Sequence, residues 1–219
     1  TLHDDIGDQY QTYNGMLFNV SARLGQGLQF QGGINLGQTV QDNCDVRAQV
    51  PELTTGAGTS PAVNPGNPYC HSDPGLITKA TALGSYTIPK IDVSIAGTFR
   101  SDQGGVLAAN WNAPVALVSQ ALGRPAAVVG TTVPINLVAP GEVWGDRVNA
   151  LDLRFGKILR FGRMRYNVGV DIINATNSNA TLTYNQSFNP TGTVPAQRWL
   201  APTSILTPRF VKFSAQIDF

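Results

Sequence analysis

The sequence predicts an all-β fold, a segment of an antiparallel transmembrane β-barrel with about seven strands. The composition supports this, because only 13% of the 219 residues are charged, against about a quarter in typical soluble domains. Apolar and polar residues alternate in repeated runs, and no apolar run reaches the roughly 18 residues that a membrane helix needs. The connections between these runs alternate between short and long, as they do in outer-membrane barrels.

The strands follow from period-2 alternation, which places apolar side chains on one face of a sheet. The final run is the clearest, because every odd position from Val211 to Phe219 is apolar and every even position is polar. Seven runs alternate in this way, and we expect one strand in each: residues 16–24, 28–36, 80–88, 91–99, 151–156, 166–172 and 211–219.

The connections predict the topology. Short turns are expected near residues 25–27, 89–90 and 160–164, and long segments near residues 40–78, 101–146 and 175–205. Barrels of the outer membrane have short periplasmic turns and long extracellular loops. A soluble β-sandwich is the rival fold, but the polar positions include charged residues such as Arg23, Arg154 and Asp171, which suit a wet barrel interior.

The strand number predicts that residues 1–219 form only the C-terminal portion of a barrel. Every backbone N–H and C=O group in hydrocarbon must be paired, so a lipid-exposed sheet can have no open edge. Seven strands leave two edges, and bacterial single-chain barrels have even strand numbers. We therefore expect further strands upstream of Thr1.

The long connections contain further local signals. Cys44 and Cys70 lie in one polar stretch and are expected to form a disulfide, which implies an oxidising compartment; the alternative is a pair of reduced cysteines. Residues 114–123 predict a short loop helix that begins at a proline and ends at a glycine. Residues 126–139 are expected to pack on themselves or to cover the barrel mouth.

No pattern of catalytic or cofactor-binding residues is present, so we expect no enzyme, no cofactor and no metal site. His3 and His71 are the two histidines, too few for three or four converging metal ligands. The net charge of +1 argues against nucleic-acid binding. Trp111, Trp144 and Trp199 lie in or beside long loops, where they could contact an extracellular ligand; the alternative is that they pack the loops together or flank the membrane interface.

Three groups of residues resemble TonB-dependent outer-membrane receptors. Residues 207–219 resemble the last strand of that family, and residues 145–155 and 169–177 resemble its penultimate hairpin. Residues 85–92 and 109–112 resemble the large receptors whose N-terminal extension is similar to a carboxypeptidase regulatory domain. The sequence contains no plug domain, no TonB-contacting segment and no such extension.

The resemblance implies a barrel of about 22 strands around a plug, in the Gram-negative outer membrane, that imports a bound ligand. This chain would supply barrel wall and ligand-capturing loops. Its partners would be membrane lipid, the other strands and plug of the receptor, and TonB indirectly. Phe213, Ala215, Ile217 and Phe219 resemble the signal that the barrel-assembly machinery recognises. A non-transporting or porin-like barrel and a secreted β-sandwich binding module remain alternatives.

Overall fold

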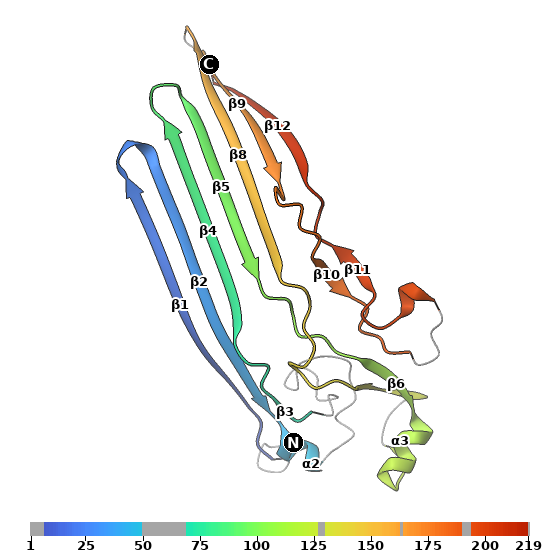
Figure 1. Ribbon diagram of the computed structural model, residues 1–219. Coiled ribbons are helices and arrows are strands. Elements are labelled where there is room, and N and C mark those ends of the chain that lie inside the picture. The colour runs from blue at the N-terminus through green and yellow to red at the C-terminus, as the bar shows by residue number, and fades with distance from the viewer. Residues whose placement is uncertain (1–6, 50–68, 127–129, 163, 190–193, 219) are drawn as a thin grey trace.

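The computed structural model describes residues 7–49, 69–126, 130–162, 164–189 and 194–218. They form mostly antiparallel β-sheet (Figure 1). The main sheet contains seven long strands in chain order: β1 (Tyr10–Leu24), β2 (Leu28–Asp42), β4 (Ile77–Ile88), β5 (Val93–Asp102), β8 (Val148–Phe161), β9 (Met164–Ile173) and β12 (Phe210–Asp218). A two-residue strand, β3 (His71–Ser72), pairs with the end of β2. The seven predicted strands are confirmed, and each pairs with the next along the chain.

The connections contain the remaining elements. These are η1 (Gly25–Gly27), α2 (Cys44–Gln49), β6 (Asn110–Pro114), α3 (Val115–Leu122), β7 (Thr132–Asn136), β10 (Thr181–Tyr184), η3 (Pro195–Gln197) and β11 (Pro202–Ile205). The predicted loop helix is confirmed as α3, which ends at Gly123 with a φ of 67°, a conformation that glycine adopts readily. Across the described ranges, no helix has the length and apolar character that crossing a membrane requires.

The register places most apolar residues of the seven strands on one side of the sheet; Leu17, Leu83 and Phe210 are exceptions and are exposed on the other side. Phe18 lies opposite Ile34, Phe155 opposite Val170, and Val170 opposite Phe213. We call this side the apolar face. Its large exposed side chains are Met16, Phe18, Val20, Leu24, Leu28, Phe30, Ile34, Ile95, Phe99, Phe155, Phe161, Met164, Val168, Val211, Phe213 and Ile217. The alternation seen in the sequence therefore continues from strand to strand.

The opposite side, which we call the polar face, contains the predicted charged positions of the strands. Arg154 forms an ion pair with Asp171 at 3.1 Å, and its Nη2 donates a hydrogen bond to Ser214 at 3.4 Å. Asp92, which was expected in a strand, instead lies in the β4–β5 turn. Its φ of 50° lies outside the range of strands, and its carboxylate pairs with Arg160 at 3.0 Å.

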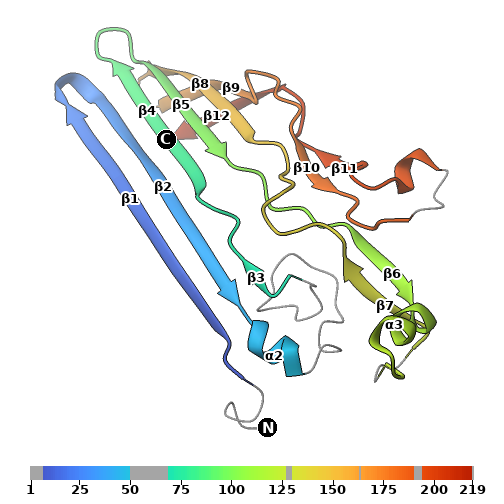
Figure 2. The same cartoon turned by 60° about the horizontal axis from the view of Figure 1, so that its bottom comes forward.

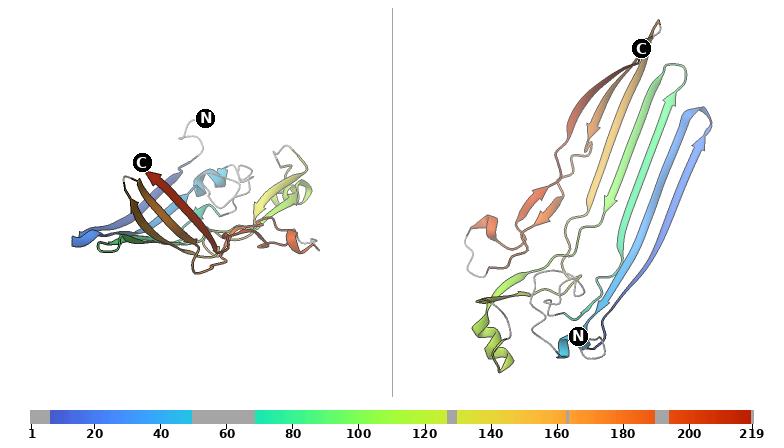
Figure 3. Two further views of the ribbon diagram at one scale, coloured as in Figure 1. Left: turned by 90° about the horizontal axis from the view of Figure 1, so that it is seen from above. Right: turned by 180° about the vertical axis from the view of Figure 1, so that it is seen from behind.

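The sheet is open, so closure into a barrel is not seen. Among the described residues, β1 pairs only with β2, and β12 pairs only with β9. Figure 3 shows the sheet from above and from behind, with β1 and β12 at its two edges. The short turns and the end of β12 lie at one end, and the start of β1, α2 and α3 lie at the other (Figures 1 and 2).

The buried apolar side chains lie in the long connections and not in the sheet. Among the described residues they are Leu107, Ala108, Ala109, Ala113, Val133 and Ala180. The β5–β8 and β9–β12 connections pack together there, because Asn110 donates its N–H to the Gln186 carbonyl and Phe188 donates its N–H to the Asn110 carbonyl. We call this packed region the loop layer. Neither face of the sheet has a core of its own.

One aromatic side chain packs over two glycines at the loop end of the sheet. Gly15 and Gly37 lie opposite each other in β1 and β2, and the Tyr13 side chain occupies the space that a Cβ atom would take at either position. The ring therefore covers backbone that would otherwise be exposed, an arrangement that also helps to define the strand register.

We expect Gly37→Val to lower the free energy of unfolding by about 1–3 kcal/mol, because the new side chain collides with the Tyr13 ring. Gly84→Val is the matched control, since a Cβ atom at Gly84 meets nothing within 4 Å. Urea unfolding in detergent, followed by tryptophan fluorescence, measures both variants. Removing the ring in the Tyr13→Ala, Gly37→Val double variant should recover part of the loss. Equal effects at Gly37 and Gly84 would contradict this packing.

Candidate functional site

The apolar face has a definite height along the strands. In β1 it runs from Met16 to Leu24, and in β2 from Leu36 to Leu28. Eight residue steps of β-strand correspond to about 27 Å. A strand tilt of about 40° reduces this to a height of about 21 Å, close to the roughly 25 Å apolar band of outer-membrane barrels. Beyond Met16, the same side of β1 continues with Asn14 and Thr12, so the band ends there.

The exposure of this face is unusual for a surface in water. Phe213 is 79% exposed, Met16 65% and Phe18 59%. Soluble monomers rarely expose contiguous apolar patches larger than a few hundred Å². Here large apolar side chains are exposed on six of the seven long strands, β1, β2, β5, β8, β9 and β12. Such a face requires an apolar environment or a partner that covers it.

One charged side chain lies within the apolar face and was missed in the sequence analysis. Lys157 belongs to β8, and its partners Val93 and Val168 both lie on the apolar face. Its Nζ donates a hydrogen bond to the Ile91 carbonyl in the β4–β5 turn. The alternation in the sequence could have predicted this position, because Leu153, Phe155 and Lys157 follow one another at every second residue. The predicted strand, however, ended at residue 156.

Two grooves cross the apolar face. The larger, of about 490 Å³, is lined by the side chains of Val93, Phe155, Lys157, Val168, Val170 and Phe213. The smaller, of about 380 Å³, is lined by Phe18, Val20, Phe30, Ile34, Ala82 and Phe99, among others. Lys157 is the charged residue in the lining of the first groove, and the lining of the second contains none.

The residues of the predicted assembly signal follow this face. Phe213, Ala215 and Ile217 lie opposite Val170, Val168 and Tyr166 of β9, and all three are exposed. Phe219 lies outside the described residues. The structure thus places an exposed apolar row on the last strand, at the edge of the sheet.

The three tryptophans do not converge on one site. Trp199 donates its Nε1–H to the Ala108 carbonyl at 2.9 Å, and its ring packs edge-on against Phe188. Trp144 donates its Nε1–H to the Gly141 carbonyl at 2.8 Å. Trp111 lies in β6, opposite Ile135. All three are partly buried, and these contacts favour the alternative in which tryptophans pack the loops together.

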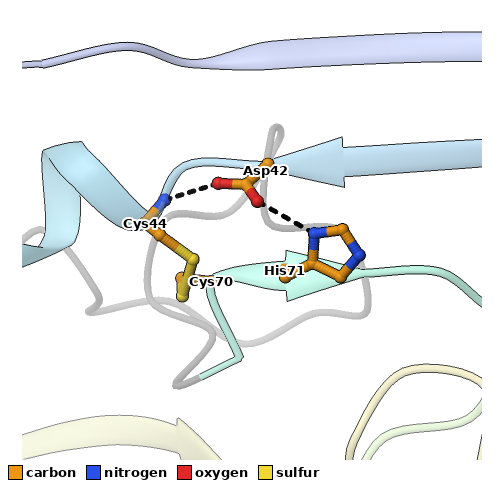
Figure 4. The surroundings of a disulfide bond; sticks show 4 residues. All are labelled: Asp42, Cys44, Cys70 and His71. Atoms are coloured by element: carbon orange, nitrogen blue, oxygen red, sulfur yellow. Dashed lines mark hydrogen bonds and ion pairs between the residues drawn. A yellow bond between two sulfur atoms is a disulfide. The ribbon is translucent and has the colours of Figure 1, made fainter.

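The predicted disulfide is present and closes one long connection (Figure 4). Cys44 and Cys70 are bonded, with their Cα atoms 4.7 Å apart. Beside them, one Asp42 carboxylate oxygen accepts the Cys44 N–H at 2.9 Å, and the other lies 2.8 Å from His71 Nδ1. The disulfide and these bonds join the end of β2 to the start of β3.

His71 has Asp42 as its partner at 2.8 Å. Among the described residues, no group of three or more His, Cys, Asp or Glu side chains could hold a metal ion. His3 lies outside the described residues.

The loop layer contains a polar pocket of about 440 Å³. Its lining includes Gln103, Asp146, Thr183, Tyr184 and Gln186. Asp146 is held in place, because its carboxylate accepts the Thr181 N–H at 2.9 Å and its own N–H is donated to the Tyr184 hydroxyl at 3.0 Å. The Thr181 N–H, and then the Tyr184 hydroxyl, lower the pKa of Asp146 below its usual value of 3.8. This carboxylate therefore remains ionised near neutral pH.

The lowered pKa predicts a small dependence of stability on pH. A carboxyl whose pKa is lower in the folded state contributes stability above its unfolded pKa, and this is lost as the pH falls through the folded value. We expect Asp146→Asn to lower the free energy of unfolding at pH 6 by less than about 1 kcal/mol, because the carboxylate is exposed. Urea unfolding at pH 6 and pH 3 should show that the difference shrinks below pH 3.8. A difference that grows on acidification would contradict the assignment.

Comparison with known proteins gave no match for this chain among protein-family models, curated proteins or solved structures.

Proposed function

We propose that this chain is part of the wall of an outer-membrane barrel, in which the apolar face contacts lipid and the loop layer faces the cell exterior. The observation that carries the proposal is the distribution of apolar side chains. They cover one face of the long strands without being buried there, while the buried apolar residues lie in the loop layer. A protein built for water places its largest apolar side chains in a core.

The two faces of the sheet fit lipid on one side and a wet interior on the other. In hydrocarbon, the side chains of the apolar face need no covering partner, because lipid chains are as apolar as they are. The polar face contains the Arg154–Asp171 ion pair and the Ser214 hydroxyl. These groups require water or polar protein atoms around them, as in the polar interior of outer-membrane barrels.

The strand directions support a larger barrel. All six pairings between the long strands are antiparallel, so β1 and β12 run in the same direction. Joining these two edges directly would create a parallel pair. Closure by antiparallel pairs alone requires an odd number of additional strands, which makes the total even, as in bacterial outer-membrane barrels. About 15 further strands would complete a barrel of about 22.

The finer part of the proposal is a TonB-dependent receptor of the Gram-negative outer membrane. The loops would capture a ligand, and a plug supplied by the same receptor would open when TonB transmits energy from the inner membrane. The exposed row of Phe213, Ala215 and Ile217 would be the region that the barrel-assembly machinery binds. The resemblance of residues 145–155, 169–177 and 207–219 to the last strands of that receptor family supports this assignment.

Limited proteolysis of intact cells, combined with fractionation, tests the proposal. The protein should stay in the outer-membrane fraction after a carbonate wash and dissolve only with detergent. Protease added outside should cut within residues 103–147 or 174–209 and spare the turns at residues 25–27 and 89–92. Preferential cleavage at those turns would contradict the orientation. A chain that is monomeric and soluble without detergent would contradict the membrane location.

A further inference from the structure

Lys157 is the charged side chain on the apolar band of the described strands. The other six long strands hold apolar or uncharged side chains at the positions that share its face. In β1 these positions run from Met16 to Leu24 and in β2 from Leu28 to Leu36, and β4, β5, β9 and β12 continue them at the same level. A lysine at the centre of a bilayer strongly destabilises a barrel, but the effect becomes small near the interface. The position of Lys157 along the strand therefore decides whether it is compatible with lipid.

The strand register places Lys157 near the short-turn end of the band. Its partner Val93 is the first residue of β5, so Lys157 is level with the β4–β5 turn. Residues 158–161 of β8 extend beyond it, and Phe161 is the last apolar side chain of this face on β8. The backbone N–H of Ile158 donates a hydrogen bond to the Asp92 carbonyl at 3.0 Å, and Lys157 Nζ donates a hydrogen bond to the Ile91 carbonyl. The ammonium group is therefore held at the level of the turn, where the hydrocarbon would end and headgroups begin.

The groove beside Lys157 continues from this end into the apolar band. Val93, Val168 and Val170 line it together with the rings of Phe155 and Phe213. The carboxylate of Asp92, in the adjoining turn, is already paired with Arg160 at 3.0 Å. The arrangement thus combines a cation at the headgroup level with an apolar groove that begins beside it.

We propose that Lys157 and this groove form a binding site for one anionic phospholipid, in the leaflet on the side of the short turns. The inference rests on the proposed membrane location. The ammonium group has three N–H donors, of which one binds the Ile91 carbonyl, so the others can reach a headgroup phosphate. An acyl chain of the same molecule lies along Val168 and Val170, between the two phenylalanine rings. Charge complementarity at one end and apolar contact along the groove select this occupant.

The smaller groove provides an internal control. It has a comparable volume and an apolar lining around Phe18, Phe30 and Ala82, but its lining contains no charged residue. It should accept acyl chains without preference for the headgroup. A difference between the two grooves therefore reports on Lys157 rather than on apolar contact in general.

Native mass spectrometry of the full-length protein, released from detergent micelles, tests the site. The probes are phosphatidylglycerol and phosphatidylcholine with identical acyl chains. A cation near a membrane surface favours an anionic lipid by about five-fold, so we expect about five-fold more retained phosphatidylglycerol on the wild type. Lys157→Gln should remove the preference and Lys157→Arg should keep it. Lys79→Gln, on the polar face, should have no effect.

Filling each groove separately sharpens the test. Val168→Trp should lower retention of phosphatidylglycerol, whereas Ala82→Trp in the control groove should leave the headgroup preference unchanged. Equal retention of the two lipids by the wild type, or an unchanged preference in Lys157→Gln, would overturn the site.

The outcome also separates this inference from the proposed function. A protein that remains in the membrane fraction but shows no headgroup preference overturns the lipid site alone. A protein that is soluble without detergent overturns both.

Discussion

Replacing Asn174 by alanine is expected to destabilise the chain by about 3–5 kcal/mol, because this side chain joins the end of β9 to the segment before β12. Asn174 is 2% exposed and follows β9 directly. Its Nδ2 donates to the carbonyls of Ser178 and Thr207 at 2.8 and 2.9 Å, and its Oδ1 accepts the Ser178 N–H at 2.9 Å. Alanine leaves these partly buried groups without their partners.

The backbone at Asn174 adds to the effect. Its φ of 50° is left-handed, a conformation that asparagine tolerates better than alanine. Its own N–H is donated to the Asp152 carboxylate at 2.8 Å, which connects this bend to β8. Thr207 lies three residues before β12, so the side chain connects the end of β9 to the start of β12, while the backbone N–H connects the same bend to β8.

Asn177 is the matched control for this experiment. It has the same residue type and nearly the same φ, 52°, but it is exposed, and its Oδ1 accepts one hydrogen bond, from the Arg209 N–H. Asn177→Ala should cost about 1–2 kcal/mol. Urea unfolding in detergent, followed by tryptophan fluorescence, compares the two variants. Equal losses would show that the buried hydrogen bonds at Asn174 contribute little.

A single charge on the apolar face should have the second large effect. Val20 lies midway along the band in β1 and is 58% exposed. We expect Val20→Arg to destabilise the protein in lipid vesicles by about 2–4 kcal/mol, because arginine at the middle of a bilayer is costly. In water the same exposed position would tolerate arginine with little change, so the experiment distinguishes lipid from solvent.

Ser21→Arg is the control for this charge, since Ser21 is the next residue along and lies on the polar face, opposite Gln31. It should change stability by less than about 1 kcal/mol. Urea unfolding in vesicles and the fraction of protein inserted measure both variants. If Val20→Arg is neutral, or if it raises solubility without detergent, the lipid-facing assignment fails.

The long strands could be predicted from sequence because alternation is a local pattern. Their ends could not. β1 begins at Tyr10 rather than at residue 16, because Thr12 and Asn14 lie beyond the apolar band, where polar residues occupy both faces and the alternation disappears. The same reason explains why β2 extends to Asp42. Beyond the band, the strand is maintained by backbone pairing, which leaves no periodic signal in the sequence.

The loop layer was largely unpredictable because distant segments pair there. Pro114 and Pro134 lie within β6 and β7 and argue against strands in the sequence. The bond from Trp199 to Ala108 joins residues that are 91 positions apart. By contrast, α3 and the Cys44–Cys70 pair could be predicted, since a proline and a glycine bound the helix and the chain has two cysteines.

The common direction of β1 and β12 also affects how copies of the chain meet one another. Two copies inserted into a membrane in the same orientation present edges that all run the same way. Their edges could join only as parallel pairs, which are slightly less stable per residue than antiparallel ones. The odd number of strands therefore disfavours the growth of an extended sheet from copies of this chain. The two open edges, β1 and β12, favour antiparallel pairing with the remaining strands of the barrel instead.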